Sequence, residues 1–234
     1  MWSAVIRPPR ASYLQNDLGP NEMRLGSGVN VVRSDFEIEN KRGLKMKCSH
    51  FEPLESNRKW DTMPCVIYMH GNASNRMEAF ELVEYFLSSN ITLFCFDFPG
   101  CGNSEGEYIS LGWWERDDVG CIIDYLRQNR KISSVGLWGR SMGAVTALLH
   151  GDRDPTIAGM VLDSPFSNLR TLIDELASTV ASVPKFLLGA AIWSVKKSIK
   201  SRAHFDIGDL TPITHVKECF IPAVFATGEQ DDFI

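Results

Sequence analysis

Short apolar runs separated by longer amphipathic stretches make up most of the chain after residue 64. The runs are apolar on both alternating faces, as in strands buried inside a parallel sheet, and they occupy residues 65–69, 92–96, 135–138, 159–162 and 223–226. Helical spacing of apolar positions occurs between them at about 76–88, 113–128, 142–150 and 169–182. This alternation predicts an α/β fold, with a mostly parallel central sheet and helices on both faces.

The residues before 64 follow a different pattern. Residues 29–39 and 44–51 alternate apolar and polar positions around a Lys-Arg-Gly turn, which predicts an N-terminal antiparallel hairpin. Residues 1–30 are rich in Pro, Asn and Gly without periodicity, so we expect an irregular N-terminal arm. The folded domain would then cover residues 31–234.

The interval 164–218 is too long for a single crossover between strands, and we expect it to form a small helical cap. Within it, residues 187–200 are apolar on one side and basic on the other. Packing of the apolar side on the domain is the favoured interpretation, and contact with a membrane surface is the alternative.

Composition narrows the possible partners and the location. The net charge of −5 removes a general attraction to phosphates, so we expect no nucleic acid partner. No apolar stretch reaches the roughly 18 to 20 residues of a membrane helix, and the N-terminus lacks the order of a signal peptide, which favours a cytoplasmic location. The six cysteines have no zinc-site spacing, so we expect reduced thiols and no metal.

A nucleophile motif follows the 135–138 run directly. Gly139-Arg140-Ser141-Met142-Gly143 lies between a predicted strand and a predicted helix, which is the context of the G-x-S-x-G elbow. Gly139 and Gly143 permit the tight turn that exposes the Ser141 hydroxyl. The Met142 N–H, at the start of the helix, is placed to donate to an oxyanion.

Loops after two other runs are expected to support this site. His70-Gly71-Asn72-Ala73 follows the first parallel strand, where the elbow architecture takes its second oxyanion donor, and Asn72 is our candidate. We expect His70 to orient the loop rather than to act as the base. Asp97 opens a glycine-rich loop that matches neither a dinucleotide fingerprint nor a P-loop, so we expect Asp97 to fix the loop and no nucleotide to bind.

The acid of a catalytic triad is expected after the last strand, where its carboxylate would orient a histidine. Asp231 is the first candidate and Asp232 the second. Asp163, at the end of the 159–162 run, is a third candidate.

These motifs resemble the α/β-hydrolase superfamily, in its serine aminopeptidase S33-like branch of α/β-hydrolase domain-containing proteins. The resemblance covers residues 35–234 and rests on the runs 137–144 and 96–100 together with the position of the acid. It implies an α/β-hydrolase fold, a nucleophile at Ser141, an acid at Asp231, and oxyanion N–H groups at Asn72 and Met142. It implies no metal and no organic cofactor.

The base of such a triad is missing from the expected place. In the family it follows one further strand beyond the acid, whereas this sequence stops at Ile234. Its five histidines are poor substitutes by position: His50, His70, His150, His204 and His215. A fragment of a longer hydrolase is the favoured interpretation, and a natural truncation with little activity is the alternative.

We therefore expect a serine hydrolase that cleaves an ester, thioester or amide through an acyl-enzyme on Ser141. A small acyl or lipid-like substrate is favoured by apolar cap residues, which are Leu172, Leu176, Phe186, Leu187, Leu188, Ile192 and Trp193. A catalytically inactive binding module is the alternative, because the triad histidine is absent.

Overall fold

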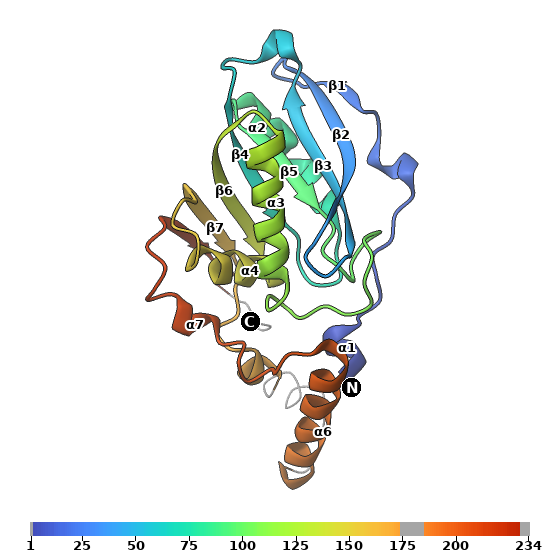
Figure 1. Cartoon of the computed structure of the whole chain (residues 1–234). Helices are drawn as coiled ribbons and strands as arrows, with labels where there is room; N and C mark the ends of the chain where they lie inside the picture. Colours follow the sequence, from blue (N-terminus) through green and yellow to red (C-terminus); the bar gives the residue numbers. More distant parts are fainter. Residues whose placement is uncertain (1, 174–184, 230–234) are drawn as a thin grey trace.

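An eight-stranded sheet forms the centre of the computed structural model, which describes residues 2–173 and 185–229 (Figure 1). The strand order is β1-β2-β3-β5-β4-β6-β7-β8. Its parallel part consists of β4 (Met63–Met69), β5 (Thr92–Phe96), β6 (Ile132–Arg140), β7 (Gly159–Asp163) and β8 (Ala223–Ala226). Each of these strands contains one of the predicted apolar runs, which confirms the α/β fold.

The predicted hairpin is also present. It pairs β2 (Asn30–Glu39) antiparallel with β3 (Lys45–Pro53), and β3 joins the parallel strands by antiparallel pairing with β5. A 3₁₀ turn (η2, Glu55–Asn57) follows β3. The alternating pattern of this segment therefore identified both strands correctly.

The first 30 residues are not wholly irregular, contrary to the sequence-based expectation. They contain a short helix (α1, Trp2–Ile6), a 3₁₀ turn (η1, Gln15–Leu18) and a three-residue strand (β1, Glu22–Arg24) that pairs with β2. Elements this short show no periodicity. They are held by tertiary contacts, such as the complete burial of Ile6.

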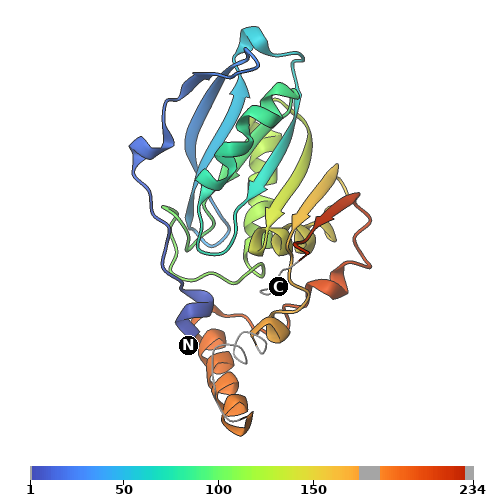
Figure 2. The same cartoon turned by 180° about the vertical axis from the view of Figure 1, so that it is seen from behind.

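Helices cover both faces of the sheet. One face carries η3 (Arg76–Leu82) and α2 (Val83–Ser88), and the other carries α3 (Glu115–Asn129) and α4 (Met142–Gly151) (Figure 2). Every residue of α4 is buried, as expected for a helix that is apolar at most of its positions. The next predicted helix begins at residue 169, and its part beyond residue 173 lies outside the described residues.

The predicted cap interval contains α6 (Lys185–Ala203) and α7 (Pro212–His215). The buried side chains of Val195, Ile199 and Ala203 belong to the main core, and α6 contacts α1. Together α1 and α6 project from one end of the molecule (Figures 1 and 2). Among the described residues, no helix combines the length and the apolar character needed to cross a membrane.

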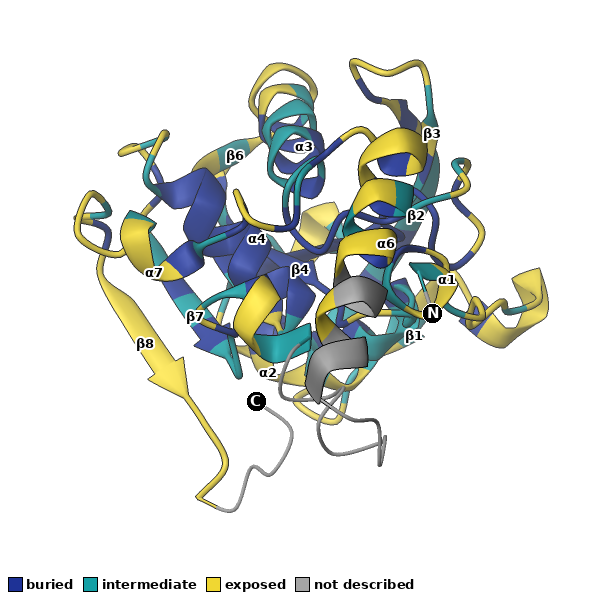
Figure 3. Cartoon of the chain, turned by 90° about the horizontal axis from the view of Figure 1, so that it is seen from below, coloured by how far each residue is buried: buried dark blue, intermediate teal, exposed yellow. Residues whose placement is uncertain are grey.

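Strand β8 forms an exposed edge of the sheet. All four of its residues are exposed, whereas α4 is buried (Figure 3). On the α2 side, strands β6 to β8 border a groove of about 550 Å³ lined by apolar side chains, including Phe86, Trp138, Val161 and Val224.

Candidate active site

Ser141 occupies a strained turn between β6 and α4. Its backbone has φ 52° and ψ −112°, a conformation that non-glycine residues rarely adopt. Its N–H donates to the carbonyl of Asp163 over 2.7 Å, and its carbonyl accepts from the N–H of Val145 over 3.0 Å. These two hydrogen bonds stabilise the strained backbone conformation of Ser141. The geometry is that of a nucleophile elbow.

Gly139 and Gly143 are both required by close backbone contacts. A Cβ on Gly139 would lie 2.2 Å from the carbonyl carbon of Gly143. A Cβ on Gly143 would lie 2.1 Å from the carbonyl oxygen of Met69 and 2.9 Å from that of His70. The motif therefore shapes the turn and also presses it against the loop that follows β4.

That loop contains the candidate oxyanion donor Asn72. Asn72 is exposed, whereas Met142 is completely buried as the first residue of α4. Gly71 lies beside the elbow, since a Cβ there would be 3.8 Å from the carbonyl oxygen of Arg140. The structure thus brings the loop and the elbow together.

His70 fixes this loop from inside the protein. Its Nδ1 lies 2.7 Å from the carbonyl oxygen of Gly71, and its Nε2 lies 3.1 Å from the amide nitrogen of Phe98. Because Nε2 accepts the amide proton, Nδ1 carries the ring proton and donates. Burial lowers the pKa of His70, against the opposing effect of the Gly71 hydrogen bond. His70 is therefore neutral and orients the loop, as expected from its position.

Glu78 links the same loop to the elbow, a role that the sequence did not reveal. Its carboxylate accepts from the Tyr68 hydroxyl over 2.8 Å and from the Gly71 N–H over 3.3 Å, and it lies 3.4 Å from the Arg140 guanidinium. Burial tends to raise the pKa of Glu78, but hydrogen bonds from Ser74 and Tyr68 outweigh it and lower the pKa. Glu78 is thus an anion beside the end of β6. Its only sequence signal was a charge in an amphipathic segment.

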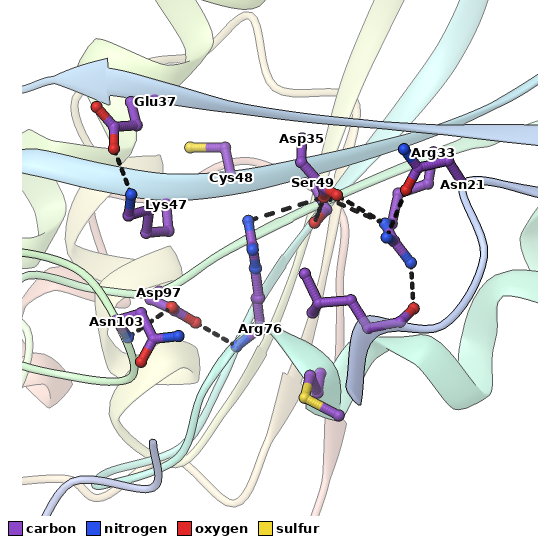
Figure 4. A network of polar contacts seen from close by, with 12 residues as sticks. Asn21, Arg33, Asp35, Glu37, Lys47, Cys48, Ser49, Arg76, Asp97 and Asn103 are labelled. Carbon is purple, nitrogen blue, oxygen red and sulfur yellow. Dashed lines mark hydrogen bonds and ion pairs between the residues drawn. The ribbon is translucent and has the colours of Figure 1, made fainter. Parts of the chain in front are cut away.

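Asp97 fixes the glycine-rich loop, as expected from its position after β5. One oxygen accepts from the Arg76 N–H over 2.7 Å, and the other accepts from the Tyr13 hydroxyl over 2.7 Å and the Asn103 N–H over 2.9 Å. A Cβ on Gly102 would overlap the Asp97 carboxylate, at 2.4 Å from its carbon. Figure 4 shows this carboxylate pointing towards Arg76 and Asn103. The Asp97 carboxylate therefore occupies the space enclosed by the glycine-rich loop.

A buried arginine attaches the N-terminal arm to the sheet beside this loop. Arg33 is 2% exposed and donates to the carbonyl of Leu18 and, over 2.7 Å, to the side chain of Asn21. It also pairs with Asp35, whose carboxylate accepts from Ser49 (Figure 4). The arm is thus part of the folded domain.

Of the acid candidates, only Asp163 belongs to the described residues. Its carboxylate lies 3.9 Å from the Arg140 guanidinium and accepts from the hydroxyl of Ser164. Asp231 and Asp232 lie outside the described residues. Strand β8, which precedes them, ends beside Asp163 because Ala226 pairs with it.

The histidines near α4 lie at the wrong end of that helix to serve Ser141. His215 pairs with Asp152, and His150 lies 3.0 Å through Nδ1 from the carbonyl oxygen of Arg116. His150 and Asp152, the partner of His215, are eight and ten residues beyond Met142, or about 12 and 15 Å along the helix at 1.5 Å per residue. Neither histidine is within reach of Ser141.

The two remaining histidines also make no contact with the elbow. His50 is completely buried in β3, where its Nδ1 lies 3.3 Å from the Glu52 carboxylate. His204 follows α6 with φ 56°. Among the described residues, no hydrogen bond joins a histidine to the Ser141 hydroxyl.

The expected apolar lining of the cap is only partly described. Leu172 packs against the main core, and Trp193 is 65% exposed. Trp193 is exposed because the stripe at Val195, Ile199 and Ala203 is the one that packs inward. The other five apolar side chains named from the sequence lie outside the described ones.

All six cysteines are free thiols, four of them buried. Burial raises the pKa of Cys65 to about 12 and that of Cys101 to about 12. Thiols with such pKa values stay protonated and are not nucleophiles at neutral pH.

The fold and the elbow define the class of protein: an α/β-hydrolase. The family model described as serine aminopeptidase, S33, matches residues 61–205, and the chain belongs to this family. The crystallised esterase Pf2001 of Pyrococcus furiosus has the same fold, with a TM-score of 0.70 and 22% identity over 98% of this chain and 79% of that chain.

Curated relatives are longer than this chain. YqkD of Bacillus subtilis, an uncharacterized protein, is 23% identical over 207 residues, which cover 87% of this chain and 65% of the relative. The lysophosphatidylserine lipase ABHD12 of Gallus gallus is 29% identical over 179 residues, covering 61% of this chain and 46% of the relative. The chain spans about half to two thirds of these relatives.

Proposed function

We propose that this chain carries the nucleophile of a serine hydrolase. Ser141 attacks an ester, thioester or amide carbonyl, the bond to the leaving group breaks, and an alcohol, thiol or amine departs with the serine proton. Water then hydrolyses the acyl-enzyme, which releases the acid and restores Ser141. The observation that carries this proposal is the strained Ser141 turn, with φ 52°, between β6 and α4. Such strain persists in proteins mainly where the side chain it presents has a function.

The neighbouring loop supports the same chemistry. In the proposed reaction, the N–H groups of Asn72 and Met142 donate to the oxyanion, while His70 and Glu78 hold the loop against the elbow. Preorganised donors of this kind stabilise the charge that develops in the transition state. Asp231 is the proposed acid, with Asp232 and Asp163 as alternatives.

A histidine outside these 234 residues is the proposed base. Support comes from the engagement of His50, His70, His150 and His215 with other groups, and from the greater length of the relatives. A serine without a base is a weak nucleophile at neutral pH. We therefore expect a form extended to the length of the relatives to react faster than the 234-residue chain.

We propose that the enzyme recognises an apolar acyl group and that its substrate is a lipid-like molecule. One relative is named as a lysophosphatidylserine lipase and a structural neighbour as an esterase. The proposed location is the cytoplasm.

A fluorophosphonate probe tests the nucleophile directly, because it phosphonylates only an activated serine. We expect labelling of Ser141 in the extended form and none in Ser141→Ala. Ser164→Ala is the matched control, since Ser164 also has a positive φ of 51° and follows the neighbouring strand. Equal labelling of wild type and Ser141→Ala would refute the proposal.

A binding module without catalysis is the second candidate, because no described histidine reaches Ser141. It predicts a folded extended form that no probe labels. In that case Ser141→Ala would bind ligands as well as the wild type does.

A further inference from the structure

Positive charge is concentrated on the projecting helix α6. The helix carries five basic residues and no acidic residue, although the chain as a whole has a net charge of −5. The basic residues are Lys185, Lys196, Lys197, Lys200 and Arg202. Four of the five lie in the C-terminal half of α6, which contacts α1 at one end of the molecule (Figures 1 and 2).

The two sides of α6 have different surroundings. Val195, Ile199 and Ala203 are buried, whereas Trp193 is 65% exposed and Lys197 is exposed. Trp193 and Lys197 are four residues apart and so lie on one face. The ammonium of Lys197 lies 5.3 Å from the centre of the Trp193 ring. An aromatic ring and a cation are thus presented together to solvent.

Part of the positive charge is left without an acidic partner. Asp206 pairs with Lys196 over 2.8 Å and with Lys200 over 3.4 Å. Within residues 2–173 and 185–229, neither Lys197 nor Arg202 has a carboxylate partner. Arg202 instead lies over the ring of Trp2 on α1, with 4.3 Å between its guanidinium carbon and the ring centre.

We propose that the exposed face of α6 that carries Trp193, Lys197 and Lys200 docks on anionic phospholipid bilayers. Lys197, at the centre of this face, is attracted to the anionic headgroups. The Trp193 indole fits the headgroup boundary, where an apolar ring with one polar N–H is favoured. The acidic remainder of the protein is repelled by the same surface, which confines contact to α6.

Vesicle binding by the 234-residue chain tests this docking without using Ser141. We expect co-sedimentation with vesicles containing about 30% phosphatidylserine and much weaker binding to pure phosphatidylcholine. Raising the salt from about 0.05 M to about 0.5 M is expected to reduce binding at least tenfold. Millimolar inorganic phosphate is expected to have no effect beyond its ionic strength.

The double variant Trp193→Ala/Lys197→Glu is expected to reduce the bound fraction at least fivefold. Lys59→Glu/Trp60→Ala is the matched control, because Trp60 is 50% exposed and lies 4.7 Å below the ammonium of Lys59. Both variants remove one exposed indole and change the net charge equally. Far-ultraviolet circular dichroism checks that both are folded.

Three results would overturn the proposal. Equal loss in both variants would mean that overall charge, not α6, controls binding. Equal binding to neutral and anionic vesicles would exclude headgroup recognition, and displacement by phosphate at constant ionic strength would indicate a soluble anion as the ligand. None of these results depends on labelling of Ser141, so the docking and the proposed hydrolase fail separately.

Discussion

Gly143 and Met69 are in such close contact that no side chain fits between them: a Cβ on Gly143 would lie 2.1 Å from the carbonyl oxygen of Met69. This contact joins the first turn of α4 to the end of β4. Ser141, the proposed nucleophile, and the loop containing Asn72 are thereby held together.

Gly143→Ala is expected to separate these two elements. The methyl group would overlap backbone rather than a flexible side chain, so the variant should lose fluorophosphonate labelling and about 1 to 3 kcal/mol of stability to urea. Gly189→Ala is the matched control, because nothing lies within 4 Å of a Cβ there. That helical change should stabilise the protein by up to about 1 kcal/mol. A Gly143→Ala variant with normal stability and labelling would contradict this view of the elbow.

Glu78→Gln is expected to loosen the loop while leaving the fold intact. The amide removes the charge paired with Arg140 and one of the oxygens that accept from Tyr68 and Gly71. In the extended form, kcat for ester hydrolysis should fall by about tenfold or more, with a smaller change in KM.

Glu84→Gln provides the comparison for Glu78→Gln, because Glu84 also accepts two backbone N–H groups, from Gly26 and Ser27, each over 3.0 Å. It should leave kcat unchanged. A rise in KM at constant kcat for Glu78→Gln would show that Glu78 binds substrate and does not position the loop.

Acid is expected to destabilise the protein through His50. Burial is the main cause that lowers the pKa of His50 to about 4, from 6.5. Between these values the unfolded chain binds a proton at this site and the folded chain does not, so stability falls as the pH drops from 6.5 to 4. The size of this contribution is about 3 kcal/mol, at 1.36 kcal/mol per pKa unit.

Urea unfolding measures this effect between pH 4 and 6.5. The free energy of unfolding should depend less steeply on pH in His50→Gln than in the wild type. Asp118 acts in the opposite direction, since burial raises its pKa to about 7. The test therefore compares slopes between variants. His204→Gln is the exposed control, and an unchanged slope in His50→Gln would contradict the assignment.

The exposed edge strand β8 is expected to promote self-association. Among the described residues no strand pairs with the outer edge of β8, and Val224 there is 63% exposed, so its apolar side chain favours pairing with a second 234-residue chain. Val224→Lys should reduce concentration-dependent association in sedimentation velocity experiments. Ile213→Lys, at a 57% exposed position on α7, adds the same charge away from the edge. Equal effects of both changes would assign association to net charge.

Local sequence was sufficient for the strands and the elbow. The apolar runs of β4 to β7 were recognisable because strands inside a sheet are covered by helices on both faces. The run of β8 has the same pattern, although all four of its residues are exposed. The glycines of the elbow were recognisable because their spacing encodes a local contact between residues 139 and 143. Both predictions depended on neighbours in the chain.

Long-range polar contacts were not predictable in the same way. Arg140 pairs with Glu78, which is 62 positions away in the sequence. Arg33 donates to backbone carbonyl groups of the arm, and an acceptor in the backbone cannot be recognised from the residue type. Trp193 was grouped with the residues expected to bind an apolar substrate because the sequence showed only that the cap interval is rich in apolar residues. Which side of α6 packs inward depends on its contact with α1, and the sequence analysis did not predict that short helix.

Direct observation of an acyl-enzyme tests the central claim that Ser141 is the nucleophile. The extended form would be mixed with a p-nitrophenyl ester, quenched with acid and analysed by intact mass and peptide mapping. The account predicts one acyl group on Ser141 in the wild type and in Ser164→Ala, and none in Ser141→Ala. An acyl group on another residue, or hydrolysis that persists unchanged in Ser141→Ala, would contradict it.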